Sequence, residues 1–277
     1  MSAESYPTAQ HEPALSAGRP TVSIILPVLN EEAQLERCLR AVGEQSYPAI
    51  IEVVVADGGS TDETRAAAAR FAKVRVVENP RHIRPAGLNA AIAAASGEII
   101  VRVDARTKLA PDYVERCVAA LERSGAAIVG GQMRYEAHDA CQRGIVAAMT
   151  SRFGAGPAAF RREGGEPRHV DTVYLGAFRA STIRDMGGYD EWSGGNEDAE
   201  LAWRAQLFGG VYLDPSIRSL YLGRDGLGPL ACQFYRYGRN RARTIRKHPS
   251  SLSWRQLAVP ALVLGLASPR RRQVLAS

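Results

Sequence analysis

The chain has 277 residues, 45% of them hydrophobic and 23% charged, which is enough to build the core of one large domain or two small ones. The formal net charge of +6 favours an anionic partner, such as a phosphorylated substrate, an anionic membrane or a nucleic acid. The four cysteines are too far apart in the sequence for a metal knuckle or a redox pair, so we expect reduced thiols in a cytosolic protein.

Residues 1–20 are polar, contain prolines and lack the pattern of a secretory signal, so we expect a flexible tail. Beyond them, short apolar β-branched runs alternate with amphipathic segments, which predicts strands at 21–26, 52–56, 74–77, 98–103 and 127–129. The amphipathic segments predict helices at 31–43, 60–72, 86–95 and from Pro111 onward, with a capping box at Ser60 and Glu63. Residues 137–168 are expected to be an irregular, mobile acceptor loop, and order resumes over 170–214.

This alternation predicts an α/β fold with a mostly parallel central sheet, right-handed crossovers and helices on both faces. Ligands of such sheets bind beyond the carboxyl ends of the strands. Three polar groups follow predicted strands, at 27–30, at 57–60 and at Asp104. We therefore expect them to line one edge of the sheet.

Several carboxylates are candidates for chemistry. Glu197, Asp198 and Glu200 open a predicted helix after two glycines. They can simply suit the helix dipole, or one of them can be a general base that deprotonates a sugar hydroxyl. Asp57 can accept hydrogen bonds from a base or ribose, and Asp104 can contact a nucleotide phosphate or a metal, although both can also be turn residues.

The motifs together resemble a family 2 glycosyltransferase of the GT-A fold, of the succinoglycan-type exopolysaccharide branch. They occur in family order from Pro27 to Tyr237, about three quarters of the chain. The matching segments are Pro27-Val28-Leu29-Asn30-Glu31-Glu32, Asp57-Gly58-Gly59-Ser60-Thr61-Asp62, Gly87-Leu88-Asn89, Ser96-Gly97-Glu98, Gly176-Ala177-Phe178-Arg179, Gly187-Gly188-Tyr189-Asp190-Glu191, Asn196-Glu197-Asp198 and Gln233-Phe234-Tyr235-Arg236-Tyr237.

The resemblance implies an inverting transfer of a sugar from a nucleotide-sugar donor, usually a UDP-sugar, to a saccharide or lipid-linked acceptor in polysaccharide biosynthesis. It makes Asp198 the base, with Glu197 beside it. The donor side is expected to comprise Pro27, Asn30, Glu31, Asp57, Asn89, Asp104 and Arg106. The acceptor or diphosphate side is expected to comprise Gly176, Arg179, Gln233, Arg236 and Tyr237.

The sequence departs from this family at the cation site. The family usually has Asp-x-Asp after the fourth strand, where the second Asp ligates Mg²⁺ or Mn²⁺, whereas this chain has Asp104-Ala105-Arg106. Arginine cannot ligate a hard cation. We expect Mg²⁺ or Mn²⁺ at Asp104, with the alternative that Arg106 itself neutralises the diphosphate.

The C-terminal part differs in character, so we expect a glycosyltransferase domain over 21–228 and a membrane-associating segment over 229–277. Six basic residues lie between Arg236 and Lys247, among aromatic residues, and an apolar run follows at 257–267. That run is too short to span a bilayer. We expect a cytoplasmic protein, peripheral to or anchored at the inner face of the membrane, although a solvated helix face is the alternative. No nucleic-acid motif accompanies the charges, so we expect no nucleic-acid partner.

Two other functions are compatible with this kind of sheet. A catalytically inactive nucleotide-sugar-binding or scaffold protein needs no base, so Asp198 argues against it and Arg106 argues weakly for it. A sugar-nucleotide pyrophosphorylase would need a glycine-rich phosphate loop near the first strand, and residues 27–32 lack one.

Overall fold

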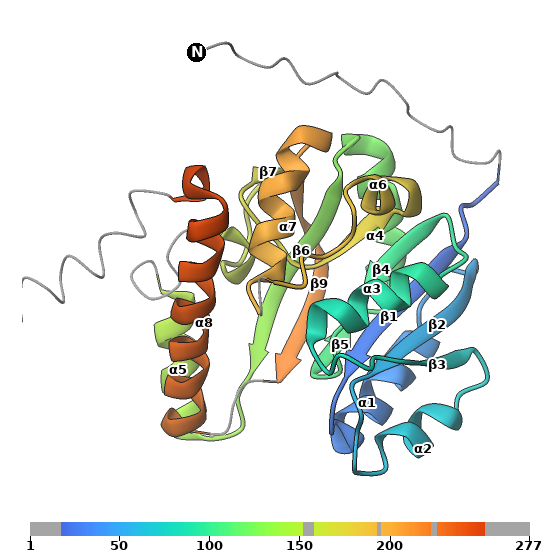
Figure 1. Cartoon of the computed structure of the whole chain (residues 1–277), viewed down its shortest axis with the longest axis horizontal. Coiled ribbons are helices and arrows are strands. Elements are labelled where there is room, and N and C mark those ends of the chain that lie inside the picture. The colour runs from blue at the N-terminus through green and yellow to red at the C-terminus, as the bar shows by residue number, and fades with distance from the viewer. Residues whose placement is uncertain (1–17, 152–157, 193–194, 223–225, 253–277) are drawn as a thin grey trace, which may run out of the picture.

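The computed structural model describes residues 18–151, 158–192, 195–222 and 226–252, and all structural statements below refer to them (Figure 1). They form one nine-stranded sheet in the order β3-β2-β1-β4-β8-β6-β9-β5, with β7 paired to β9. The strands are β1 Val22–Val28, β2 Ile50–Asp57, β3 Val74–Glu78, β4 Ile99–Arg102, β5 Thr107–Leu109, β6 Ile128–Glu136, β7 Arg168–Val170, β8 Tyr174–Arg179 and β9 Val211–Leu222.

Helices connect these strands and cover the sheet. The α-helices are α1 Glu32–Gly43, α2 Thr64–Ala69, α3 Arg84–Ala94, α4 Tyr113–Ser124, α5 Ala140–Thr150, α6 Ala180–Asp185, α7 Glu197–Ala205 and α8 Leu227–Lys247. Short 3₁₀ helices occupy Ala159–Arg161, Gln206–Phe208 and Pro249–Ser251. The last long helix, α8, lies at one side of the molecule beside α7 (Figure 1).

The N-terminal half of the sheet is parallel, as the alternating pattern predicts. β1 pairs in parallel with β2 and with β4, and β2 pairs in parallel with β3. Val28 at the end of β1 lies opposite Asp57 at the end of β2. The polar segments that follow β1, β2 and β4 therefore leave the sheet at one edge, where we predicted them.

The C-terminal half brings later strands beside β4. β8 pairs antiparallel with β4 and β6, and β6 pairs in parallel with β9. Gly176 of β8 thereby lies opposite Arg102 of β4. Segments beyond residue 170 reach the carboxyl edge of the parallel strands through this arrangement.

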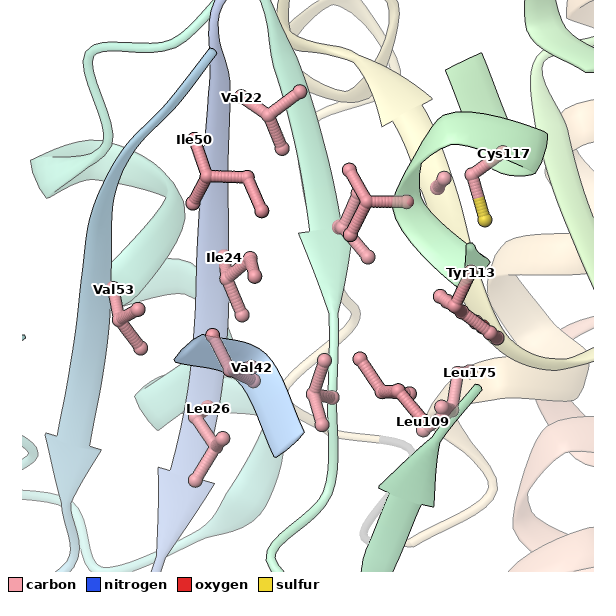
Figure 2. Close-up of a cluster of buried hydrophobic side chains, with 14 of the residues drawn as sticks. Val22, Ile24, Leu26, Val42, Ile50, Val53, Leu109, Tyr113, Cys117 and Leu175 are labelled. Atoms are coloured by element: carbon pink, nitrogen blue, oxygen red, sulfur yellow. The ribbon is translucent and has the colours of Figure 1, made fainter. Parts of the chain in front are cut away.

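A hydrophobic core fills each face of the sheet because strand residues alternate between the faces. Ile24 and Leu26 of β1 pack with residues of α1 and α4, whereas Ile25 packs with residues of α3, α6 and α7. Figure 2 shows the first of these clusters, in which Val22, Ile24 and Leu26 line up along β1.

Two local predictions are wrong. The capping box does not form, because the Ser60 hydroxyl donates to Asp57 Oδ1 (2.6 Å) and α2 begins only at Thr64, with no side-chain cap. The segment expected to be irregular contains α5, whose first turn is capped by the Asp139 carboxylate, which accepts from the Gln142 N–H. Residues 1–17, 152–157 and 253–277, including the apolar run at 257–267, lie outside the described residues.

Gly131 lets β6 and β9 lie close together. A Cβ atom at Gly131 would lie 1.9 Å from the backbone oxygen of Ile217. Ile217 is fully buried. The pairing of the two strands shifts register between Gly130 and Gln132, so β9 bulges toward this position.

We expect Gly131→Ala to lower the free energy of unfolding by about 1–3 kcal/mol, the usual cost of overpacking a tight site. Gly43→Ala is the control, because it adds the same methyl group at the end of α1 with no atom within 4 Å. That control should raise the stability by up to about 1 kcal/mol. Chemical denaturation measures both, and equal stability of Gly131→Ala and the unaltered protein would contradict the packing argument.

Candidate active site

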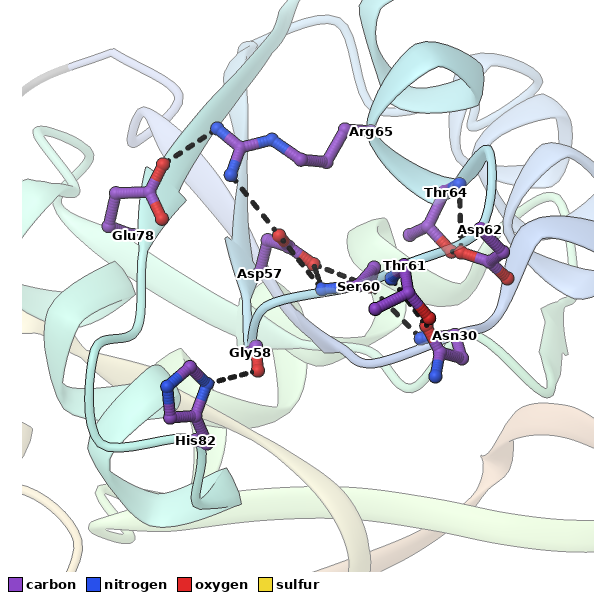
Figure 3. A network of polar contacts seen from close by, with 10 residues as sticks. All are labelled: Asn30, Asp57, Gly58, Ser60, Thr61, Asp62, Thr64, Arg65, Glu78 and His82. Atoms are coloured by element: carbon purple, nitrogen blue, oxygen red, sulfur yellow. Dashed lines mark hydrogen bonds and ion pairs between the residues drawn. The ribbon is translucent and has the colours of Figure 1, made fainter.

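The turn after β2 is organised by the carboxylate of Asp57 (Figure 3). Asp57 is fully buried and accepts hydrogen bonds from the hydroxyl (2.6 Å) and the backbone N–H (3.2 Å) of Ser60. Arg65 of α2 lies 3.3 Å from its second oxygen and also pairs with Glu78 at 2.7 Å. This carboxylate therefore shapes the turn, and its predicted contact with the donor nucleoside stays a prediction.

The segment after β1 is tied to the same turn. Asn30 has a left-handed backbone (φ 52°), its N–H donates to the Ser60 hydroxyl (3.0 Å), and its side-chain oxygen accepts from the Thr61 N–H (2.9 Å). Glu31 follows, with Arg106 Nε at 3.3 Å from its carboxylate. The structure thus brings Pro27, Asn30, Glu31, Asp57 and Arg106 together at the carboxyl edge of β1, β2 and β4.

His82 completes this side of the edge and was not predicted from the sequence. Its Nδ1 atom lies 2.6 Å from the carbonyl oxygen of Gly58 (Figure 3). Gly59 has a φ of 85°, and a Cβ there would lie 2.8 Å from the His82 ring. The absence of a side chain at Gly59 therefore allows the imidazole to pack directly against the backbone of the turn.

The centre of the edge is an ion cluster built around Arg102. Its side chain is 1% exposed, and its Nε lies 3.2 Å from Asp104 Oδ1. Its Nη1 atom contacts the carboxylate of Asp198, and its Nη2 atom lies 3.7 Å from Glu197 Oε1. The guanidinium also lies 5.5 Å from the centre of the Tyr189 ring.

Strand alternation explains why this arginine meets α7. Ile100 and Arg102 are two residues apart and therefore point to the same face of β4. Ile100 packs in the cluster that contains Leu201 and Ala202 of α7. The first turn of α7, with Glu197 and Asp198, is thereby placed over Arg102.

The pKa values of the two outer carboxyl groups move in opposite directions. For Asp104, burial opposes ionisation, but Arg102 and Arg84 outweigh it and lower the pKa. For Asp198, removal from water, together with the Glu197 and Asp104 carboxylates, raises the pKa to about 6 against the opposing charge of Arg102. The Asp198 side chain is nevertheless 39% exposed, so a ligand can reach it.

Arg84, the first residue of α3, is a second guanidinium at this centre. It lies 4.0 Å from Asp104 and 3.6 Å from Glu197, and its side chain is 54% exposed. The Asp104 carboxylate raises the pKa of Arg84, and the Glu197 carboxylate adds to this effect.

Three other predicted residues have structural partners. The Asn89 side chain donates to the Tyr189 carbonyl (2.9 Å) and accepts from the Tyr189 N–H (2.8 Å), which ties α3 to the segment before α7. Gly176 lies beside Arg102 in the sheet. Arg179 pairs with Ile99 at the opposite end of β4 and donates to the Leu121 carbonyl at 3.1 Å, so the structure does not bring it to the site.

The C-terminal half of α8 packs on α7 and on the segment that precedes it. Asn196 donates to the Thr244 hydroxyl (2.7 Å), and His248 lies 3.2 Å from the buried Glu200 carboxylate. The His248 ring also lies 4.3 Å from the Trp203 ring. Glu200 is therefore a packing partner, which also pairs with Arg204 at 2.7 Å.

The N-terminal half of α8 carries the predicted Gln233, Arg236 and Tyr237. By helical spacing all three lie on the same side of α8 as Asn240 and Thr244, one or two turns before them, and the Gln233 amide donates to the Tyr237 hydroxyl at 2.6 Å. Their predicted role beside the sugar or diphosphate stays a prediction. No helix in the described part of the chain is both long and apolar enough to cross a bilayer.

The cation that the resemblance implies would bind Asp104. One oxygen of this carboxylate faces Arg102 at 3.2 Å and the other faces Arg84 at 4.0 Å. Within the described ranges, no group of three His, Cys, Asp or Glu side chains is placed to hold a metal ion. A carboxylate flanked by two guanidiniums does not fit a protein-held divalent cation, because the added positive charge would be repelled.

The sequence contains a signal for each of the two arginines, Arg102 and Arg84. Arg102 is the one charged residue in the apolar run Ile99-Ile100-Val101-Arg102-Val103, and a buried charge requires partners. Arg84 opens a helix, where a positive charge is unfavourable unless anions lie nearby. Each arginine therefore requires carboxylates nearby, and the structure places Asp104 and Glu197 beside both of them.

Comparison with known sequences agrees with this geometry. The profile of Glycosyl transferase family 2 matches residues 23–167. The succinoglycan biosynthesis protein ExoA of Rhizobium meliloti (strain 1021) is 32% identical over 252 residues, which are 87% of this chain and 76% of that protein. Glycosyltransferase AglE of Haloferax volcanii is 33% identical over 122 residues, which are 42% of this chain and 40% of that protein.

Solved structures share the fold. S. aureus TarS 1-349 in complex with UDP-GlcNAc has a TM-score of 0.57 at 16% identity, and the match covers 75% of this chain and 60% of that one. Mannosyltransferase PcManGT from Pyrobaculum calidifontis, in complex with GDP-Man and Mn²⁺, has a TM-score of 0.55 at 19% identity, with 95% and 86% covered. The predicted α/β fold of the GT-A type is confirmed. From the extent of the profile and of the match to ExoA, the chain belongs to family 2 of the glycosyltransferases.

Proposed function

We propose that the protein transfers a sugar from a nucleotide-sugar donor to a saccharide or lipid-linked acceptor in polysaccharide biosynthesis, with inversion at the anomeric carbon. The similarity to a succinoglycan biosynthesis protein supports the class of product. The TarS fragment was solved with UDP-GlcNAc, which supports a uridine donor. PcManGT was solved with GDP-Man, so guanosine nucleotides are the comparison ligands in a binding test.

In this proposal Asp198 is the general base. Its carboxylate takes the proton of an acceptor hydroxyl while that oxygen forms a bond to the anomeric carbon. The bond from the anomeric carbon to the diphosphate oxygen breaks on the opposite face, and the leaving nucleoside diphosphate keeps the electron pair. A single displacement of this kind inverts the configuration of the sugar.

The observation that carries the proposal is the state of the Asp198 carboxyl group. It is 39% exposed at the start of α7, beside Glu197, which is 2% exposed. Its pKa is raised to about 6, and a base works best when its pKa is close to the working pH. The Mg²⁺ or Mn²⁺ suggested by the resemblance does not fit the surroundings of Asp104, so we assign no step to it.

We expect Asp198→Asn to lower kcat of sugar transfer by about 10²–10⁴-fold, because the amide keeps the shape but takes no proton. Donor affinity should stay close to that of the unaltered protein. In the unaltered protein, kcat should be constant above a pH of about 6 and fall below it, since the raised pKa leaves the base protonated there.

The matched control is Asp185→Asn on α6, which removes one exposed carboxylate outside the site and should leave kcat unchanged. Glu197→Gln should cost less than Asp198→Asn if Glu197 orients rather than abstracts. If Asp198→Asn retains more than about a tenth of the activity, the base is another group.

We also propose that the exposed half of α8 binds anionic membrane surfaces, as the sequence predicted for this region. Phe234 is 44% exposed, Tyr235 73% and Tyr237 42%. Arg236, Arg239 and Arg243 are exposed on the same helix. Aromatic and basic residues in this combination suit the interface of an anionic bilayer.

Reversing three of these charges, with Arg236→Glu, Arg239→Glu and Arg243→Glu together, should weaken binding to phosphatidylglycerol-containing vesicles by about 100-fold or more, because each basic residue contributes about 1 kcal/mol. The control reverses Arg40, Arg70 and Arg116 on α1, α2 and α4 or at their ends, so the net charge is the same; Arg40 and Arg70 are exposed and Arg116 is half-buried. Co-sedimentation measures both variants. Equal loss in the two would show that only net charge matters and that α8 is not the binding surface.

A further inference from the structure

The positive charge at the catalytic edge comes from guanidinium groups of three different elements or loops. Arg102 belongs to β4, Arg84 opens α3, and Arg106 follows β4. Each of them faces at least one carboxylate. They differ in how much of their charge remains available to a ligand.

Arg102 is not available. It is 1% exposed, its Nε bonds Asp104 at 3.2 Å, and it also contacts Asp198. Arg106 is 22% exposed and its Nε faces Glu31 at 3.3 Å. Both guanidiniums are therefore largely committed to protein carboxylates.

Arg84 is available. Its side chain is 54% exposed, and its nearest carboxylate oxygens are 3.6 Å away on Glu197 and 4.0 Å away on Asp104. Both distances exceed that of a hydrogen bond, so these contacts hold the guanidinium by charge without using its N–H groups. A guanidinium has five N–H donors in a planar fork that matches two phosphate oxygens.

The same carboxylates place Arg84 where a donor diphosphate would lie. Asp104 directly follows β4 at the carboxyl edge, and Glu197 precedes Asp198 on α7. Arg84 is within 4.0 Å of both carboxylates, and its side chain is the most exposed of the cluster's guanidiniums. A cation beside Asp104 would compete with Arg84 for that position, because both carry positive charge.

We infer that Arg84 supplies the positive charge for the donor's diphosphate and that donor binding needs no divalent cation. This inference rests on the proposed function, because it names a contact of the same donor site. Arg84 holds the diphosphate by charge-assisted hydrogen bonds, and the buried Arg102 keeps Asp104 and Asp198 in place beneath it.

The first test is calorimetric titration of the full chain with UDP and with GDP, in EDTA and in Mn²⁺. UDP should bind in EDTA, with an affinity that Mn²⁺ changes by less than about threefold. UDP binding that occurs only in Mn²⁺ overturns the inference and leaves the proposed function standing. If neither UDP nor GDP binds in EDTA or in Mn²⁺, the inference and the proposed donor site are both contradicted.

The second test compares variants of exposed arginines in EDTA. Arg84→Ala should weaken UDP binding by about 10–100-fold, the loss expected for a hydrogen bond to a charged group, and should leave uridine binding within about twofold. Arg84→Lys should restore part of the affinity. Arg70→Ala, at a residue with a 66% exposed side chain, is the control and should bind UDP normally.

Unfolding curves exclude a general loss of structure in Arg84→Ala. If a folded Arg84→Ala protein binds UDP as tightly as the Arg70→Ala control, the assignment of Arg84 is wrong. If UDP and uridine binding fall by the same factor, Arg84 does not act on the diphosphate and the inference is equally overturned.

Discussion

The ion cluster around the buried guanidinium of Arg102 is the interaction on which the candidate active site depends. A charge at a position that is 1% exposed is stable only with close partners, and Asp104, Glu197 and Asp198 provide them. These partners come from the loop after β4 and from α7, which are far apart in the sequence. A buried charge left without any partner typically costs about 3–5 kcal/mol, so Arg102 needs these carboxylates as a group. The cluster therefore fixes α7 to the centre of the sheet.

The strand order makes that contact possible. The parallel strands β1, β2 and β4 place their following loops at one edge, and those loops bond one another through Ser60, Asn30 and Glu31. The antiparallel strand β8 then returns the chain beside β4, so that α7 covers the face that Ile100 and Arg102 share. The loop after β4 and the first turn of α7 thus both place carboxylates against the buried Arg102.

The sequence predicted the parallel half of the fold and the approximate position of most site residues. Apolar β-branched runs determine buried strands, and the loops after them must share an edge. The resemblance to a family then supplied roles for residues such as Asp198. The sequence did not predict the partners of Asp57, Asn89 and Glu200, because those contacts depend on tertiary placement. It also misplaced Arg179, since a residue at the end of an antiparallel strand lies at the opposite edge from one at its start.

A few side-chain contacts join the C-terminal end of α8 to the start of α7. A helix of nine residues such as α7 has too few internal hydrogen bonds to form alone, so tertiary contacts must order it. Part of that stabilisation comes from Thr244 and His248, which contact Asn196 and Glu200. The predicted division at residue 228 lies between these two segments, and it stays a prediction. Local opening of the C-terminal end of α8 would expose those contacts first, and hydrogen exchange in α7 would then report the stability of α8 as well as its own.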